Sequence, residues 1–105
     1  MMKVVTFGEI MLRLSPPNYK RIFQTETFDV TFGGAESNVS AILSQLGLES
    51  YFVSKVPDNP IGKAAVGHLK KFGVNTKYIV KNGERLGIYF LEIGASQRPS
   101  KVVYD

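Results

Sequence analysis

Cysteine and tryptophan are absent from this chain of 105 residues, and histidine occurs once. Without cysteine the chain forms no disulfide, no thiolate metal site and no cysteine nucleophile. One histidine supplies too few nitrogen ligands for a histidine-based metal centre, so we expect no metal site. The lack of cysteine also fits a reducing compartment, and we expect a cytoplasmic protein.

Long hydrophobic runs are missing as well. The apolar run at residues 3–7 is too short for the hydrophobic region of a signal peptide. The longest later run, residues 86–95, is interrupted by Glu92 and falls short of the roughly 20 residues that a membrane span needs. We therefore expect no targeting segment and no membrane partner.

The charge is modest: 13 Lys and Arg against 9 Asp and Glu give a net +4. This balance favours anionic partners but lacks the clustered basicity of a dedicated nucleic-acid binder. We expect no nucleic-acid partner, although the charge and the aromatic strands leave such a binder as an alternative. The length and the 44% of hydrophobic residues fit one globular domain, not a two-domain enzyme.

Hydrophobic periodicity predicts alternating strands and helices. We expect helices at 35–46 and 60–72, and strands at 3–7, 10–14, 28–32, 48–56, 77–80, 86–93 and 101–105. Strand and helix alternating through short connections predict an α/β fold around a parallel sheet. The regular part supplies about three parallel strands, fewer than a doubly wound sheet normally has, so we expect a partial sheet and a truncated protein.

Both predicted helices have amphipathic patterns and end signals. In the first, an apolar stripe recurs at helical spacing: Ala35, Val39, Ile42, Leu43 and Leu46. Gly47 follows as its C′ residue, and Asn59 with Pro60 predicts the N-cap and first position of the second helix. His68 lies within the second helix with no other ligand nearby, so we interpret it as a structural histidine.

Polar and glycine residues gather where strands end. Gly33 and Gly34 join a strand to a helix and would bare backbone N–H groups at the helix amino terminus, with Asn38 one turn on. The alternative is a plain tight turn with Asn38 on the surface. Glu9 follows the first strand, where ligands collect in α/β sheets, or is a solvated loop charge. No Walker A or GxGxxG motif is present.

Aromatic residues mark three β-rich segments. Tyr89 and Tyr104 could each hydrogen-bond a sugar hydroxyl, or could only pack in a sheet. Phe28, Val30 and Phe32 form one face of a strand, which covers the chain's own core or another chain. We interpret the segment around Pro99 as a solvated loop that holds Arg98 and Lys101 together with Ser96, Gln97 and Ser100. The alternative is that its two basic residues contact an anionic substrate.

The order of these features resembles the ribokinase-like, or PfkB-type, carbohydrate kinases. The resembling segments are 4–9 (VVTFGE), 32–38 (FGGAESN), 56–62 (VPDNPIG), 72–74 (FGV) and 87–90 (GIYF). They span essentially the whole chain. The Gly-Gly-Ala-Glu-x-Asn run together with Gly-Ile-Tyr-Phe is the most specific part, and it resembles the 2-keto-3-deoxygluconate kinase branch.

The resemblance implies a Rossmann-like parallel sheet with helices and a small β lid. On this basis residues 1–105 are the amino-terminal portion of a kinase domain, with the core at about 1–9 and 34–80 and the lid at about 10–33 and 86–105. The family's sugar contacts carry over to Gly33, Gly34, Asn38, Tyr89 and Tyr104, while Glu9 remains a candidate from its place after a strand. Lids of this family often pair between subunits, which implies a homo-oligomer.

The implied activity is transfer of the γ-phosphoryl group of ATP, with Mg²⁺, to a small sugar acid, 2-keto-3-deoxygluconate. The family's Gly-Ala-Gly-Asp motif, with its catalytic Asp and anion hole, does not occur in this chain. We therefore expect no catalytic residue, no ATP site and no activity from these residues alone. One further departure is Val56-Pro57-Asp58, where the family commonly has Val-Gly-x-Asp.

Two further alternatives stay open, beside the nucleic-acid binder named above. Within the class, the acceptor could be fructose or ribose, as in fructokinases and ribokinases. From a different class, the chain could be a non-catalytic module that binds a small acid or dimerises through the β lid.

Overall fold

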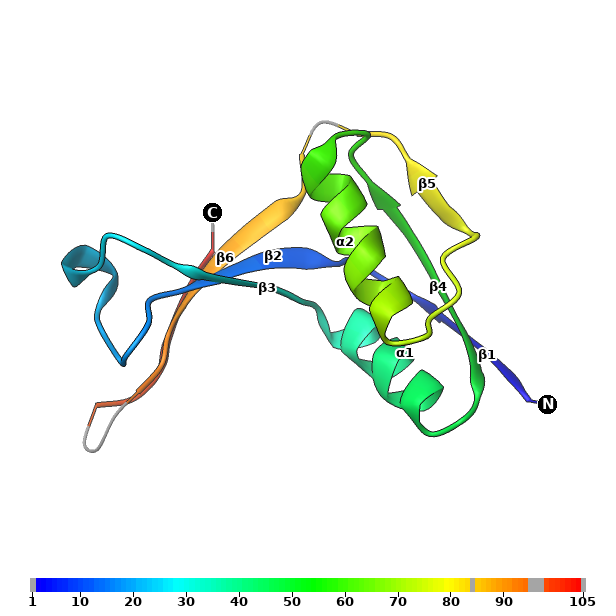
Figure 1. Cartoon of the computed structure of the whole chain (residues 1–105), viewed down its shortest axis with the longest axis horizontal. Helices are drawn as coiled ribbons and strands as arrows, with labels where there is room; N and C mark the ends of the chain where they lie inside the picture. Colours follow the sequence, from blue (N-terminus) through cyan, green and yellow to red (C-terminus); the bar gives the residue numbers. More distant parts are fainter. Residues whose placement is uncertain (1, 84, 95–97, 105) are drawn as a thin grey trace. The chain divides into compact units, whose positions relative to one another are not determined.

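The structure, a computed structural model, describes residues 2–83, 85–94 and 98–104 (Figure 1). Its elements follow the order β1 (Lys3–Phe7), β2 (Met11–Ser15), η1 (Ile22–Gln24), β3 (Asp29–Gly33), α1 (Ala35–Gln45), β4 (Glu49–Val56), α2 (Pro60–Lys71), β5 (Ile79–Lys81), β6 (Gly87–Glu92) and β7 (Lys101–Tyr104). The predicted elements are confirmed to within two residues at each described end. The short helix η1 was not predicted, and Asp105, the predicted end of the last strand, lies outside the described residues.

The chain divides into two compact units. Unit 1 comprises residues 1–11 and 32–86, and unit 2 comprises residues 12–31 and 87–105. Unit 1 holds a parallel sheet in the order β1-β4-β5, while a second sheet has the order β3-β2-β6-β7. The α/β class with a parallel sheet and helices is therefore confirmed.

In unit 1 the register of the sheet determines which side chains share a face. Ser50 of β4 pairs with Val4, and Tyr51 pairs with Val5. Because successive strand residues point to opposite faces, Ser50 and Phe52 share one face with Val4, and Tyr51 shares the other with Val5. Both α1 and α2 lie on the first of these faces (Figure 1). Phe52, at 0% exposure, is buried beneath them.

Helix α2 begins and ends as its sequence predicts. The Asn59 side chain accepts a hydrogen bond of 2.9 Å from the Gly62 N–H, and Pro60 occupies the first helical position. At the other end Gly73 N–H donates to the Lys70 carbonyl and Val74 N–H to the Leu69 carbonyl, the two bonds of a Schellman motif. These contacts set the two ends of α2.

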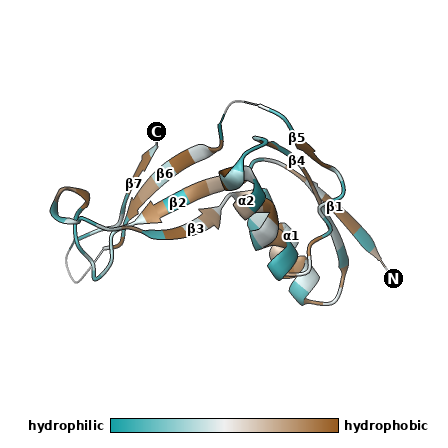
Figure 2. Cartoon of the chain, turned by 45° about the horizontal axis from the view of Figure 1, so that its top comes forward, coloured by the Kyte–Doolittle hydropathy of each residue, from teal (hydrophilic) through white to brown (hydrophobic). Residues whose placement is uncertain are grey.

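Helix α1 packs on the sheet through serine, contrary to the face that its apolar stripe predicts. Ser37 and Ser40 are its buried residues, and the Ser40 hydroxyl lies 2.6 Å from the Ser50 hydroxyl of β4. In contrast, Ile42 is 59% exposed and Leu46 73% exposed. Small hydroxyl side chains allow the helix to approach the strand closely, so the apolar stripe is left on the outside of unit 1 (Figure 2).

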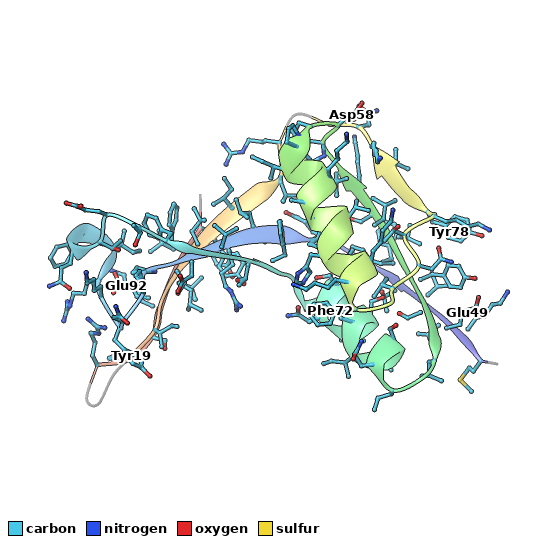
Figure 3. The ribbon with its side chains drawn as sticks, in the orientation of Figure 1. Tyr19, Glu49, Asp58, Phe72, Tyr78 and Glu92 are labelled. Atoms are coloured by element: carbon cyan, nitrogen blue, oxygen red, sulfur yellow. The ribbon has the colours of Figure 1, made fainter. Side chains whose placement is uncertain are left out.

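In unit 2, the end of β2 and the long loop after it contact β6 through hydrogen bonds and one aromatic pair. Ser15 Oγ donates to the Leu91 carbonyl over 2.8 Å, and the Ile22 N–H donates to a Glu92 carboxylate oxygen over 3.2 Å. The ring of Phe28 packs edge-on against that of Phe90, with centroids 5.6 Å apart. The loop after β2 is thus attached to β6 along its length, and Figure 3 shows Glu92 and Tyr19 in this part of the unit.

Candidate functional site: a glycine corner and a tyrosine pair

The corner between β3 and α1 is a close approach of two backbones. Gly33 ends β3 and is buried, and Gly34 is the N-cap of α1 with φ +128° and ψ 132°. L-residues rarely adopt this conformation, and a Cβ at Gly34 would overlap the backbone carbonyl of Glu9. The corner therefore needs glycine for two reasons, and Glu9 lies directly against it.

A serine that sequence reasoning missed fixes this corner. Ser37 is 3% exposed, and its hydroxyl donates to the carbonyl oxygens of Gly34 and Gly33, at 3.0 Å and 3.3 Å. The bond holds both glycine carbonyls in place from within the first turn of α1. The sequence signal for this contact is a serine three residues after the N-cap residue. From that position a short hydroxyl side chain reaches back to the backbone carbonyls of the preceding turn.

The amino terminus of α1 has no side-chain cap, because its N-cap is glycine. Asn38 donates its backbone N–H to the Gly34 carbonyl over 3.0 Å, and its side chain is exposed, like that of Glu9. The first-turn amides, the Asn38 carboxamide and the Glu9 carboxylate can donate to and accept from the hydroxyls of a polyol. The structure thus gathers Gly33, Gly34, Glu9 and Asn38 at one corner of unit 1.

The two tyrosines form a pair in unit 2. Tyr89 of β6 and Tyr104 of β7 are opposite partners in the antiparallel ladder. Their ring centroids lie 5.8 Å apart at an interplanar angle of 37°. Tyr89 is half-buried, whereas Tyr104 is 70% exposed. The pair places two phenol groups side by side on one face of the antiparallel sheet, where each can donate to a hydroxylated ligand.

The basic residues of the predicted loop have other roles. Arg98 donates to the backbone carbonyls of Tyr19 and, over 3.2 Å, Ile93. Lys101 is not in a loop but begins β7, opposite Glu92. Ser96 and Gln97 of the same predicted loop lie outside the described residues. Arg98 therefore ties two loops together through its Nη2 nitrogen, while its buried Nε has no hydrogen-bond partner among the described residues.

The aromatic face predicted for residues 28–32 is largely satisfied within the chain. Phe28 packs on Phe90, and Phe32 lies 5.3 Å from the ring of His68. His68 is half-buried and also stacks edge-on with Phe72, 5.0 Å away, which confirms its structural role. Only Val30, at 60% exposure, remains largely uncovered on that face.

The Tyr51 phenol of unit 1 is a perturbed ionisable group. The Tyr51 phenol donates to a Glu49 carboxylate oxygen over 2.7 Å, and this hydrogen bond to the carboxylate, with burial, raises the pKa of Tyr51. The Tyr51 ring also packs on Tyr78, with centroids 5.7 Å apart, and Figure 3 shows Tyr78 and Glu49 at the same end of the unit. The group lies on the sheet face opposite α1 and is a packing contact.

The residues that the structure describes offer no set of three His, Asp or Glu side chains that could hold a metal ion. No helix among them is both long and apolar enough to cross a membrane. We therefore derive no chemical step through Mg²⁺ or a nucleotide from the described residues.

Comparisons with known proteins agree with the fold. The pattern of the pfkB family of carbohydrate kinases matches residues 1–105, and the chain belongs to this family. The crystal structure of 2-dehydro-3-deoxygluconokinase from Thermotoga maritima is 74% identical, with a TM-score of 0.98 over 100% of this chain and 32% of that one. A pfkB family carbohydrate kinase from Listeria grayi is 46% identical, with a TM-score of 0.95 over 98% of this chain and 32% of that one.

A curated relative has a related name. The 2-dehydro-3-deoxygalactonokinase of Haloferax volcanii is 40% identical over 103 residues, which are 98% of this chain and 32% of that protein. The chain thus spans about a third of the length of the relatives it matches.

Proposed function

We propose that this chain is the substrate-positioning, amino-terminal part of an ATP-dependent sugar kinase whose acceptor is 2-keto-3-deoxygluconate, also called 2-dehydro-3-deoxygluconate. Unit 1 corresponds to the amino-terminal part of the kinase core and unit 2 to its β lid. We assign the contacts with the sugar acid to Gly33, Gly34, Asn38 and Glu9 in unit 1 and to Tyr89 and Tyr104 in unit 2.

The glycine corner is the observation on which this proposal depends. Its backbone conformation excludes any side chain at Gly34, its helix lacks a cap, and the buried Ser37 holds its carbonyls fixed. A rigid, uncapped amino terminus with an exposed carboxamide one turn away suits a ligand rich in hydroxyls. The names of the relatives, which act on dehydrodeoxy sugar acids, support the choice of acceptor.

In the proposed mechanism this chain binds and orients. Bound ATP and its divalent ion, held by the rest of the kinase, would supply the phosphoryl group and neutralise its charge. The corner and the tyrosines would hold the acceptor so that its terminal hydroxyl has one orientation, which lowers the entropic part of the barrier. Catalysis of this class depends mainly on such positioning together with charge stabilisation.

The test uses a chimera: these 105 residues followed by the part of the Thermotoga maritima protein that lies beyond the matched third. Its initial rates with ATP are measured on 2-keto-3-deoxygluconate, 2-keto-3-deoxygalactonate, fructose and ribose. We expect the highest kcat/KM on 2-keto-3-deoxygluconate. Phosphorylation of fructose or ribose with no activity on either sugar acid would contradict the proposed acceptor.

A homo-oligomer formed through the lid is a second part of the proposal. Val30 of β3 is 60% exposed and Val102 of β7 47% exposed, so both outer strands of the lid sheet offer apolar surface. Sedimentation of the chimera should give a dimer or larger species, and Val30→Lys should shift it toward the monomer. A monomer at all concentrations would rule out this assembly.

A further inference from the structure

Asn82 and Gly83 form an exposed bend directly after β5, at one edge of the parallel sheet of unit 1 (Figure 1). The Gly83 N–H donates to the side-chain oxygen of Asn82 over 2.7 Å. Gly83 has φ +110°, a backbone conformation that glycine adopts readily and other residues rarely do. The backbone nitrogen of Gly83 and the carboxamide of Asn82 therefore lie against each other in the folded chain.

This contact brings together the two groups that react when an asparagine side chain loses ammonia. The backbone nitrogen of the next residue gives up its proton and attacks the side-chain carbonyl carbon. The bond from that carbon to the amide nitrogen breaks, and the nitrogen leaves with the proton as ammonia. Water then opens the resulting succinimide ring at one carbonyl or the other, which gives aspartate or isoaspartate. The reaction needs only water and involves no oxidation or reduction.

The surroundings of the bend leave the attacking nitrogen accessible. Gly83 has no Cβ to shield its nitrogen, and both residues of the bend are exposed, so water and hydroxide can reach them. The Asn82 N–H donates to the Val56 carbonyl over 2.8 Å, which holds the asparagine at the end of the sheet. A Cβ at Gly83 would lie 3.4 Å from Lys55 Cε, so the lysine side chain passes beside the bend. Its positive charge favours the negative charge that develops on the carboxamide oxygen during the attack.

Two of the other four asparagines are excluded by the backbone that follows them. Asn59 precedes Pro60, which has no N–H, and its carboxamide oxygen accepts a hydrogen bond from the Gly62 N–H. Asn38 precedes Val39 within α1, where the N–H groups are bonded along the helix. Neither residue can bring a free backbone nitrogen to its carboxamide while the fold is intact.

The remaining two asparagines differ from Asn82 in other ways. The carboxamide oxygen of Asn75 accepts from the Lys77 N–H over 3.0 Å and is therefore turned away from the next residue. Asn18 is exposed, as Asn82 is, but Tyr19 follows it, and a side chain on the following residue hinders the attack. Among the asparagines of this chain, only Asn82 combines exposure, a following glycine and a direct contact with its nitrogen.

We propose that Asn82 is a site of spontaneous modification, at which the bend converts the carboxamide to aspartate and isoaspartate. The conversion lowers the net charge of +4 by one and places a carboxylate beside Lys55. Isoaspartate also lengthens the main chain by one carbon atom between β5 and β6. The modification does not depend on which sugar the kinase phosphorylates, so its presence or absence is independent of the proposed function.

The test is incubation of the 105-residue chain and of the chimera at mildly alkaline pH, followed by mass spectrometry of the peptides that contain asparagine. Exchange of ammonia for water raises the mass of a peptide by about 1 Da, and methylation by an isoaspartyl methyltransferase identifies the isoaspartate. We expect the Asn82 peptide to convert at least about tenfold faster than those of Asn38 and Asn75, because the latter react only after local opening. The Asn18 peptide should also convert more slowly than that of Asn82.

Two comparisons decide the outcome. In urea Asn38 and Asn75 should convert faster than in the native protein, which reports that unit 1 is folded without urea, whereas Asn82 should convert in the folded protein at least as fast as in urea. Asn82→Gln keeps a carboxamide but requires a larger ring, and it should abolish the conversion at this position. An Asn82 that stays intact in the folded protein and converts only in urea would overturn the proposal, because the bend would then protect it. Conversion of Asn18 as fast as that of Asn82 would overturn it too, because the contact with Gly83 would not be the cause.

Discussion

At the scale of single residues, Ser37 and Tyr51 show how hydrogen bonds set local structure in unit 1. Ser37 is buried and satisfies two glycine carbonyls at the proposed sugar corner. Tyr51 donates to Glu49 on the other side of the sheet. The first contact shapes the site, while the second links stability to pH.

Replacing Ser37 by alanine should destabilise the corner. The change removes the buried hydroxyl that bonds the Gly33 carbonyl, whereas the Gly34 carbonyl keeps its bond from the Asn38 N–H, and the loss of one such hydrogen bond costs about 0.5–1.5 kcal/mol. Urea unfolding of the chimera should show a lower midpoint with an unchanged slope. Ser54→Ala, at a half-buried serine of β4 whose hydroxyl makes no hydrogen bond among the described residues, is the matched control and should shift the midpoint much less. Equal shifts for the two variants would show that the Ser37 bond is not the cause.

The raised pKa of Tyr51 predicts a pH dependence at the alkaline end. Because folding favours the protonated phenol, its contribution to stability is complete below the ordinary pKa of 10.0 and is lost as pH rises through the folded-state value. The free energy of unfolding should therefore fall above pH 10, and Tyr51→Phe should reduce that slope. Identical alkaline profiles for wild type and Tyr51→Phe would contradict this account.

At the scale of elements, the two helices show what sequence could and could not predict. Helix α2 was predictable in place and limits, because Asn59, Pro60 and Gly73 signal its ends through local hydrogen bonds. Helix α1 was equally predictable in its limits but not in its orientation. Its apolar stripe pointed to burial, whereas Ser37 and Ser40 are the buried residues. Periodicity reports which side of a helix is apolar, but which surface covers that side depends on the rest of the fold.

The candidate site likewise has features that the sequence could predict and features that it could not. The glycine pair and Asn38 were predictable, since glycine at a strand-to-helix corner has a local physical cause. The contact between Gly34 and the Glu9 backbone was not, because it joins residues distant in sequence. The pairing of Tyr89 with Tyr104 likewise depends on the register of β6 and β7, which no local signal specifies.

The serine contact between α1 and β4 can be tested with a double-mutant cycle. Ser40 is 0% and Ser50 2% exposed, and their hydroxyls lie 2.6 Å apart. Either single change to alanine should lower the free energy of unfolding by about 1–3 kcal/mol, because it leaves the other hydroxyl buried and unpaired. The double variant should cost less than the sum, with a coupling of about 0.5–3 kcal/mol. Additive losses would show that the two hydroxyls do not stabilise each other.

At the scale of the whole molecule, the chain belongs to the pfkB family and matches about a third of its relatives' length. The described residues contain a glycine corner that Ser37 holds in place, with the exposed side chains of Asn38 and Glu9 beside it. The role that we propose for this segment, positioning of the acceptor, depends on that corner.

The central claim is that Asn38, beside the glycine corner, contacts the acceptor, and the most direct test is the KM of the chimera for 2-keto-3-deoxygluconate. Asn38→Ala removes an exposed carboxamide that makes no side-chain hydrogen bond in the structure, so the fold should be unaffected. We predict a KM about 5- to 30-fold higher, the equivalent of one or two kcal/mol of lost hydrogen bonding. Lys63→Ala, on the exposed side of α2, should leave it unchanged. An Asn38→Ala chimera with the KM of the wild type would contradict the account.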